Sequence, residues 1–259
     1  MSASNMTAAA PDTPNGAKVP GSPAWWAARP VASTTPRRGR PALDTDLIIG
    51  TALRLVDEHG VHAFSLRMLA DALGSGTATL YRHFASKDEI LALTVDRVLG
   101  EPNLSDLGAL ATWQEALTAT GHRLYDALCR HPNIVSPLMA QVPVGPSGLA
   151  QRERILRALL DRGLPADLAA RAFTAVSHYV IGFTAQQHGP AAAPPTAGPQ
   201  LAAFYRRLDP DEYPAIAQTS HTLTSVPLLE EFRFGLELLV GGLDRHAQQD
   251  TRNPPPRKT

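Results

Sequence analysis

The chain has 259 residues, 44% of them hydrophobic, and its 24 basic side chains balance 24 acidic ones. This length allows one or two domains, and the balanced charge excludes a protein that is basic over its whole surface. The single cysteine, Cys129, excludes an internal disulfide and a cysteine-based zinc or iron–sulfur site, and favours a reducing, cytoplasmic setting. No apolar run reaches the ~18 residues of a membrane span, and residues 1–10 lack a secretory-signal pattern, so no membrane partner is expected.

Residues 1–36 are expected to form a disordered basic arm, because proline and small residues dominate and no helical or strand period is present. Seven prolines fall within residues 1–43, and the five basic side chains up to Arg40 face one acidic one. Trp25 and Trp26 are unusual in such a segment. They are either an incidental apolar patch or a docking point.

Helical patterns begin at Asp44, which can cap a helix whose apolar residues recur along residues 47–56. Gly60 can end this helix. Ser65 can cap a second, shorter helix, which the glycine-containing turn 74–76 ends. Two short helical segments joined by such a turn are typical of a helix-turn-helix unit.

A third short helix opens at Thr77, and its phasing buries Leu80 and Phe84. The spacing of Ser86 and Glu89 predicts a capping box at the start of a longer helix. Further helical patterns cover residues 108–130, 148–162, 166–188 and 225–247, with a shorter one at 200–208. No alternating run of strand length is present, so the predicted fold class is all-α. Residues 250–259 are expected to be a disordered polar tail.

Polar side chains crowd the open side of the third short helix. They are Thr77, Thr79, Tyr81, Arg82 and His83. A helix that presents many hydrogen-bonding groups and is too short to be stable alone suits the major groove of DNA, where base edges offer donors and acceptors.

These segments resemble the DNA-binding domain of the TetR family of bacterial repressors. The resemblance rests on Arg37–Pro41, Ala52–Gly60, Ser65–Gly74 and Thr79–Leu91, above all on Leu80-Tyr81-Arg82-His83-Phe84 followed by Lys87. It implies a three-helix DNA-binding domain at 37–91 and a larger helical ligand-binding and dimerisation domain at 92–249. One departure is that Ser75 and Gly76 replace an apolar residue, so we expect a less tightly packed turn.

The resemblance also implies which residues contact double-stranded DNA. They are Arg38, Arg40, Ser65, Arg67, Thr77, Thr79, Tyr81, Arg82, His83 and Lys87. Arg82 is the candidate for reading guanine, since arginine can bond O6 and N7 together. The arm arginines either enter a narrow minor groove or attract phosphates without specificity. Alternatively Tyr81 packs, His83 bonds within the protein, and Arg67 and Lys87 are solvated.

The second domain is expected to form a homodimer through helices 166–188 and 225–247. The apolar stripes proposed for that contact are Phe173, Val176, Val180 and Phe183, and Leu229, Phe232, Leu236, Leu239 and Val240. The alternative is that these stripes form the core of the monomer. A symmetric pair would place two recognition helices ~34–36 Å apart on a palindromic operator.

Five residues with apolar bodies and polar tips are candidates to line a pocket for a small apolar or aromatic effector, although each can instead be a packed or surface residue. They are Trp113, His122, Tyr125, His178 and Tyr179. No cofactor or metal site is expected, since no paired histidines or clustered acids occur. Enzyme motifs are absent as well, so no enzymatic activity is expected. The resemblance implies a ligand-responsive regulator, expected to be a repressor. The alternative is a DNA-binding regulator whose second domain is constitutive or docks a protein.

Overall fold

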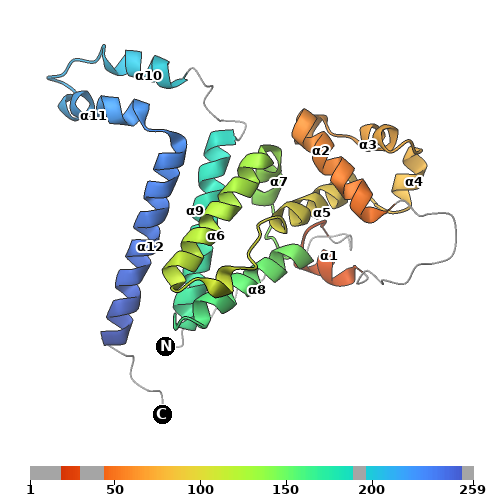
Figure 1. Ribbon diagram of the computed structural model, residues 1–259. Helices are drawn as coiled ribbons and strands as arrows, with labels where there is room; N and C mark the ends of the chain where they lie inside the picture. The colour runs from red at the N-terminus through yellow and green to blue at the C-terminus, as the bar shows by residue number, and fades with distance from the viewer. Residues whose placement is uncertain (1–18, 30–43, 189–196, 253–259) are drawn as a thin grey trace, which may run out of the picture.

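The computed structural model describes residues 19–29, 44–188 and 197–252, which form helices and turns without any strand (Figure 1). The all-α prediction is therefore confirmed. The N-terminal helices are α1 (Pro23–Ala28), α2 (Thr45–Ala63), α3 (Leu66–Ala72), α4 (Thr77–Tyr81) and α5 (Lys87–Leu99). The remaining ones are η1 (Leu107–Ala109), α6 (Trp113–Arg130), η2 (Pro132–Ile134), α7 (Val135–Met139), α8 (Pro146–Leu160), α9 (Ala166–His188), α10 (Ala197–Tyr205), α11 (Pro214–Ser225) and α12 (Leu228–Arg252).

Two serine caps fix the starts of α3 and α5, as predicted. Ser65 Oγ accepts from the Met68 amide and Ser86 Oγ from the Glu89 amide, each at 3.3 Å. The predicted capping box also requires the Glu89 side chain to accept from the Ser86 amide. This part of the prediction is wrong, because the Glu89 carboxylate accepts from the amide of Ala85 instead.

Helix α2 runs past its predicted end. Gly60 leaves the helical conformation at φ 79° and ψ 159°, but another turn follows as far as Ala63. Helix α4 is shorter than predicted, since it ends at Tyr81, and residues 82–84 continue it as a turn in which the Phe84 amide donates to the Leu80 carbonyl at 2.9 Å.

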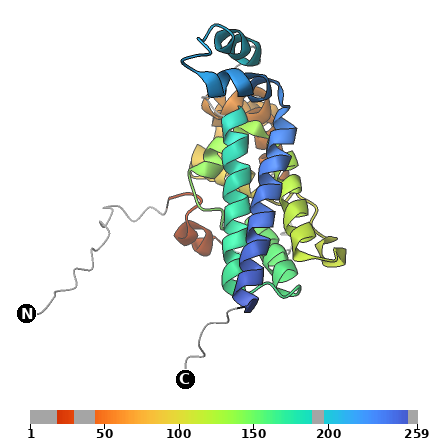
Figure 2. The same ribbon diagram turned by 90° about the vertical axis from the view of Figure 1, so that its left-hand side faces the viewer.

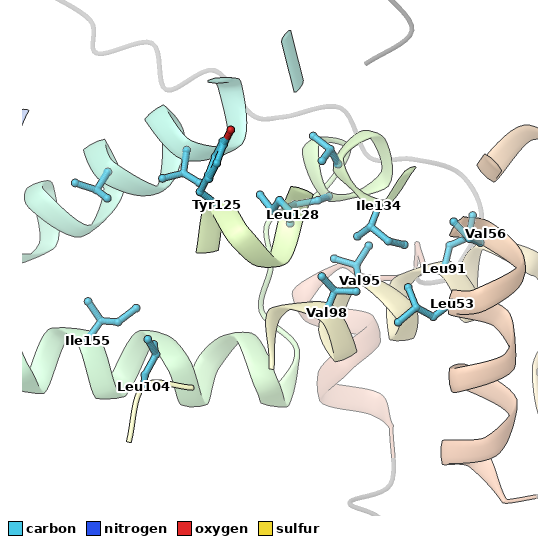
Figure 3. Close-up of a cluster of buried hydrophobic side chains, with 14 of the residues drawn as sticks. Leu53, Val56, Leu91, Val95, Val98, Leu104, Tyr125, Leu128, Ile134 and Ile155 are labelled. Atoms are coloured by element: carbon cyan, nitrogen blue, oxygen red, sulfur yellow. The ribbon is translucent and has the colours of Figure 1, made fainter. Parts of the chain in front are cut away.

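Helix α5 joins the two parts of the molecule. Figure 3 shows Leu91 and Val95 of α5 between Leu53 and Val56 of α2 on one side and Ile134 of η2 on the other. The buried core therefore runs from the helix-turn-helix unit into the second domain without a break, and the predicted boundary between residues 91 and 92 falls inside a continuous helix.

Helices α6, α9 and α12 pack on one another to form the second domain, and α9 and α12 lie side by side along their length (Figure 2). The contact between α9 and α12 is close because Gly235 lies against the Tyr179 ring. A Cβ atom at this glycine would lie 2.2 Å from Tyr179 Oη. The Tyr179 hydroxyl donates to the carbonyl of Phe232 at 2.9 Å.

Helices α10 and α11 pack mainly on each other and project from the end of the α9–α12 pair (Figure 1). No helix was predicted between residues 209 and 224. Pro214 begins α11, and none of the residues of α11 is buried, so its sequence lacks an apolar stripe facing a core.

Two predictions of disorder are wrong in part. Within residues 1–36, α1 is folded and buries Trp25. Within the predicted tail 250–259, α12 extends to Arg252. Among the described residues, no helix is both long and apolar enough to cross a membrane, and no cluster of potential metal ligands occurs.

Candidate nucleic-acid interface and internal cavity

The turn between α3 and α4 depends on Gly74, whose φ of +60° is costly for residues with a side chain. The Ser75 amide donates to the Ala70 carbonyl at 2.9 Å, which closes the turn. Ser75 Oγ is buried without a hydrogen-bond partner. The turn therefore places a small polar group where an apolar side chain could pack.

Helix α4 has no side-chain cap and only five residues, so it depends on the core beneath it. Leu80 and Phe84 are buried at 0% and 2% exposure, as predicted. The opposite side is open: Thr77, Arg82 and His83 are exposed, and the Tyr81 ring is 59% exposed.

Two of the polar side chains of this segment, Thr79 and Arg82, are bonded to each other. Arg82 Nη2 donates to Thr79 Oγ1 at 3.2 Å, which orients both groups on the same side of α4. The exposure of Tyr81 does not support the alternative of a packing role. These residues form a surface that can donate hydrogen bonds to DNA.

Three other predicted DNA contacts lie around this surface. Arg67 is exposed in the first turn of α3, whereas Ser65 is half-buried and its hydroxyl already caps that helix. Lys87 is half-buried, and its Nζ donates to the Val61 carbonyl at 2.7 Å. Lys87 is thus bonded within the protein, and the alternative of a purely solvated lysine is wrong. Arg38 and Arg40 lie outside the described residues.

A cavity of about 830 Å³ lies within the second domain. Its wall is formed by α6, α7, α8 and α9 and by the segment from Ala140 to Pro143. Most lining side chains are apolar, including Leu124, Ile155 and Phe173. A cavity of this size and lining suits a drug-sized, largely apolar molecule.

Of the five predicted pocket residues, His178 alone lines this cavity. Trp113 is buried in the core at the start of α6. His122, Tyr125 and Tyr179 instead surround Phe232 of α12, with Tyr125 stacked on that ring at a centroid distance of 4.0 Å. These four residues therefore lie outside the lining of this cavity. The rings of His122, Tyr125 and Tyr179 join α6 and α9 to α12.

Burial changes the acid–base properties of this aromatic cluster. It raises the pKa of the Tyr125 and Tyr179 hydroxyls. It also lowers the pKa of His122, and the positive charge of Arg233 adds to that effect. All three shifts favour the neutral form, which suits side chains that serve packing.

Most of the apolar stripes predicted for dimerisation are core of the monomer. Val176 and Val180 of α9 and Phe232, Leu236 and Val240 of α12 are buried in the single chain. The prediction for these residues is wrong, and the alternative of a monomer core is correct for them. The apolar side chains that α12 leaves open are Leu228, Leu229, Phe234 and Leu238.

Asp96 connects α5 with the cavity wall, a role that no sequence motif indicated. Its buried carboxylate accepts from the amides of Ser147 and Gly148 at 3.1 and 2.9 Å. These amides belong to the first turn of α8, where a negative charge is stabilised by the helix dipole. Gly148 also lines the cavity, so Asp96 ties the helix that leads to the DNA-binding surface to this wall.

Helix α1 makes a second connection. Trp25 Nε1 donates to Glu89 Oε1 of α5 at 3.0 Å, and Arg29 lies 3.6 Å from the same oxygen. At the other end, Gly21 lies directly against the side chain of Gln141, a residue of the cavity wall. The tryptophan pair therefore includes a docking residue, and its docking partner is the protein itself.

His131 makes a third connection, between α2 and the second domain. Its Nδ1 lies 2.8 Å from Asp57 Oδ2, and its Nε2 lies 3.1 Å from Glu101 Oε2. Asn133 Nδ2 donates to the Val56 carbonyl at 2.9 Å beside it. Hydrogen bonds and close polar contacts therefore join the second domain to both α2 and α5.

Comparison with known proteins agrees with this two-part architecture. Residues 48–93 match the family model described as bacterial regulatory proteins of the tetR family, and residues 107–247 match the tetracyclin repressor-like C-terminal domain. The HTH-type transcriptional repressor DrrR1 of Streptomyces coeruleorubidus is 31% identical over 219 residues, which cover 81% of this chain and 80% of that protein.

Solved structures show the same fold. Apo ActR from Streptomyces coelicolor superposes with a TM-score of 0.72 at 28% identity, over 82% of this chain and 99% of that one. ActR in complex with actinorhodin superposes with a TM-score of 0.70 at 29% identity, over 80% and 99% of the two chains. Another ActR structure contains (S)-DNPA.

Proposed function

The chain belongs to the TetR family of bacterial transcriptional regulators, and on this premise we propose that it is a repressor that releases its operator when a small molecule fills the cavity. The observation that carries this proposal is that one chain holds both an exposed recognition helix and a largely apolar cavity of about 830 Å³. Actinorhodin and (S)-DNPA are ligands of the neighbour ActR, which supports a small-molecule effector here. A bacterial DNA partner would place its action in the cytoplasm.

In this proposal α4 enters the major groove of the operator. Arg82 reads a guanine, and Tyr81 and His83 hold the DNA backbone, because these exposed groups lie on the side of α4 opposite Leu80. Lys87 can contact a phosphate either through a second N–H of its ammonium group, while it keeps its bond to the Val61 carbonyl, or by giving that bond up. Arg38 and Arg40 remain proposed contacts of the arm.

We infer that two copies associate through α12, using Phe234 and Leu238, which are 65% and 59% exposed in the single chain. They are four residues apart and share one face of the helix. Exposed aromatic and aliphatic side chains on adjacent turns are typical of an interface. Sedimentation of Phe234→Asp would show monomers where the unmodified chain is a dimer. Leu149→Asp, at an exposed leucine of α8, is the control expected to remain dimeric.

The effector would act through α5. A molecule that moves the start of α8 also moves Asp96, and movement of α5 tilts the helix-turn-helix unit that packs on it. An effector that favours the released state by ~1–3 kcal/mol changes operator affinity measurably. Binding of effector and operator must then be antagonistic in both directions.

Titration of actinorhodin and related compounds against an operator complex tests this proposal. A compound that binds the cavity raises the melting temperature of the protein with concentration and weakens its binding to DNA. Compounds that raise the melting temperature but leave operator affinity unchanged would instead support the alternative of a constitutive or protein-docking second domain.

A further inference from the structure

Resting on the proposed effector cavity, we propose that Arg152 of α8 binds an anionic group of the effector, and that the effector is a planar aromatic compound bearing a carboxylate. The proposal concerns the chemical class of the ligand. It therefore goes beyond the general statement that a small apolar molecule fills the cavity.

Arg152 is the one permanently charged side chain among the residues that line the cavity in the described part of the chain. No ion pair involving Arg152 is formed among the described residues. A guanidinium at a mostly apolar wall is costly unless a negative charge or several acceptors accompany it.

The hydrogen bonds of Arg152 are also incomplete. A guanidinium has five N–H donors. Here Nη2 donates to the Pro143 carbonyl at 3.3 Å, and Nε is buried without an acceptor. Most of the donor capacity of this side chain is therefore unused.

The neighbouring arginines differ from Arg152 in their hydrogen-bond and ion-pair partners. Arg157 pairs with Glu153, and Arg154 donates to Gln151 Oε1 at 3.2 Å. Arg162 donates to several backbone carbonyls, among them that of Leu107 at 2.8 Å. Arg157 and Arg162, which lies just beyond the end of α8, are therefore held by protein partners, and Arg154 is exposed to solvent. Arg152 differs from them because its Nε is buried without an acceptor among the described residues.

Phe173 supplies the aromatic half of the proposed site. The Arg152 guanidinium carbon lies 5.4 Å from the centroid of the Phe173 ring, and both residues line the cavity. Guanidinium and phenyl groups both stack favourably on flat rings. A planar ligand lying against Phe173 would therefore bring a ring substituent close to Arg152.

Several other polar groups of the wall are already used. Thr120 and Thr174 donate to carbonyls of their own helices, and the Gln151 amide donates to Pro102 O. The remaining polar side chains, Gln141, Ser177 and His178, carry no permanent charge. A carboxylate therefore gains most at Arg152, because charge-assisted bonds are about twice as strong as neutral ones.

The experiment compares matched acids and esters. Naphthalene-2-carboxylate, anthracene-2-carboxylate and anthraquinone-2-carboxylate, each with its methyl ester, would be titrated against the full chain, and dissociation constants measured by calorimetry. At least one acid is expected to bind, at least about tenfold tighter than its ester. Arg152→Gln should abolish this preference and leave ester binding unchanged, while Arg152→Lys should retain part of it.

Arg154→Gln removes the same charge from the same helix outside this cavity, and should keep the preference of the unmodified chain. Equal binding of acid and ester, a preference that survives in Arg152→Gln, or no acid binding up to about 1 mM would each overturn the proposal. Melting curves establish that the variants are folded. Operator release is not measured in this assay, so its outcome is separate from that of the proposed repressor function.

Discussion

The recognition surface around α4 and the cavity beneath α8 and α9 are built in opposite ways. At the surface, the side chains proposed to contact DNA come from residues 77–83 and are mostly exposed, while Leu80 and Phe84 support them from below. In the cavity, the wall is assembled from residues between Leu99 and Gly182, and the functional feature is the space that they leave unfilled.

This difference explains where each region is sensitive to change. The surface tolerates substitution of its exposed side chains without loss of fold, but α4 is too short to survive without its two buried residues. The volume and lining of the cavity depend on how four helices are placed. Contacts made far from the cavity can therefore change both. The predictions below separate these two kinds of dependence.

The largest expected effect is that of Leu80→Ala. Removal of this fully buried side chain should lower the free energy of unfolding by ~2–5 kcal/mol and abolish operator binding. Chemical denaturation gives the first quantity and fluorescence anisotropy the second. Leu201→Ala, at a leucine that is 39% exposed on α10, should change stability by less than about 0.5 kcal/mol. A variant at Leu80 that still binds the operator would show that α4 does not need its core support.

Arg82→Ala should weaken operator binding by ~1–3 kcal/mol with no change in the melting temperature, because the side chain is exposed and its one intramolecular bond is to Thr79. Arg206→Ala removes an equally exposed positive charge near the end of α10. Anisotropy titrations of both variants at one salt concentration isolate the specific contribution. Equal losses of affinity would mean that Arg82 contributes charge alone.

Trp25→Phe tests the connection through α1. The change keeps an aromatic ring but removes the bond from Nε1 to Glu89, which should cost about 1 kcal/mol and expose the α1 backbone to faster hydrogen exchange. Trp26→Phe is the matched control, since the Trp26 indole donates no hydrogen bond within the part of the chain that the structure describes. If exchange in α1 is the same in both variants, the bond to Glu89 does not hold this helix in place.

The smallest expected effect is a pH dependence of the free energy of unfolding, which arises from His122 in the second domain. Burial and Arg233 lower the pKa of His122 below its ordinary 6.5, so the unfolded chain binds the proton more readily than the folded one. His122 therefore contributes stability that is complete above that pH and declines as the pH falls below it. In unfolding measurements across this range, His122→Asn should show a shallower decline than the unmodified chain, with His62→Asn, at an exposed position of α2, as the control. Parallel curves for all three proteins would contradict this assignment.

The caps, the turn and the buried residues of the helix-turn-helix unit could be predicted because their signals are local. Ser65, Gly74, Leu80 and Phe84 lie within one short stretch, and each acts through neighbours a few residues away. Caps and helical phasing are properties of single segments, so a sequence pattern can carry them.

The cavity and the dimer surface could not be predicted in this way. Tyr125 and Val176 are residue types expected in a pocket or an interface. Both are instead buried, in a domain completed by α12, which lies more than fifty residues further along the sequence. The docking of Trp25 on Glu89 likewise joins residues 64 positions apart. Long-range packing decides which apolar side chains remain open, and a helical period alone does not contain that information.

Selection of bound DNA from a random pool, carried out with the unmodified chain and with Arg82→Ala, tests the account most directly. We expect the unmodified chain to enrich an inverted repeat with half-sites about one helical turn or a multiple of it apart, each containing a guanine that the variant no longer selects. Enriched sequences without twofold symmetry, or an identical consensus for both proteins, would contradict it.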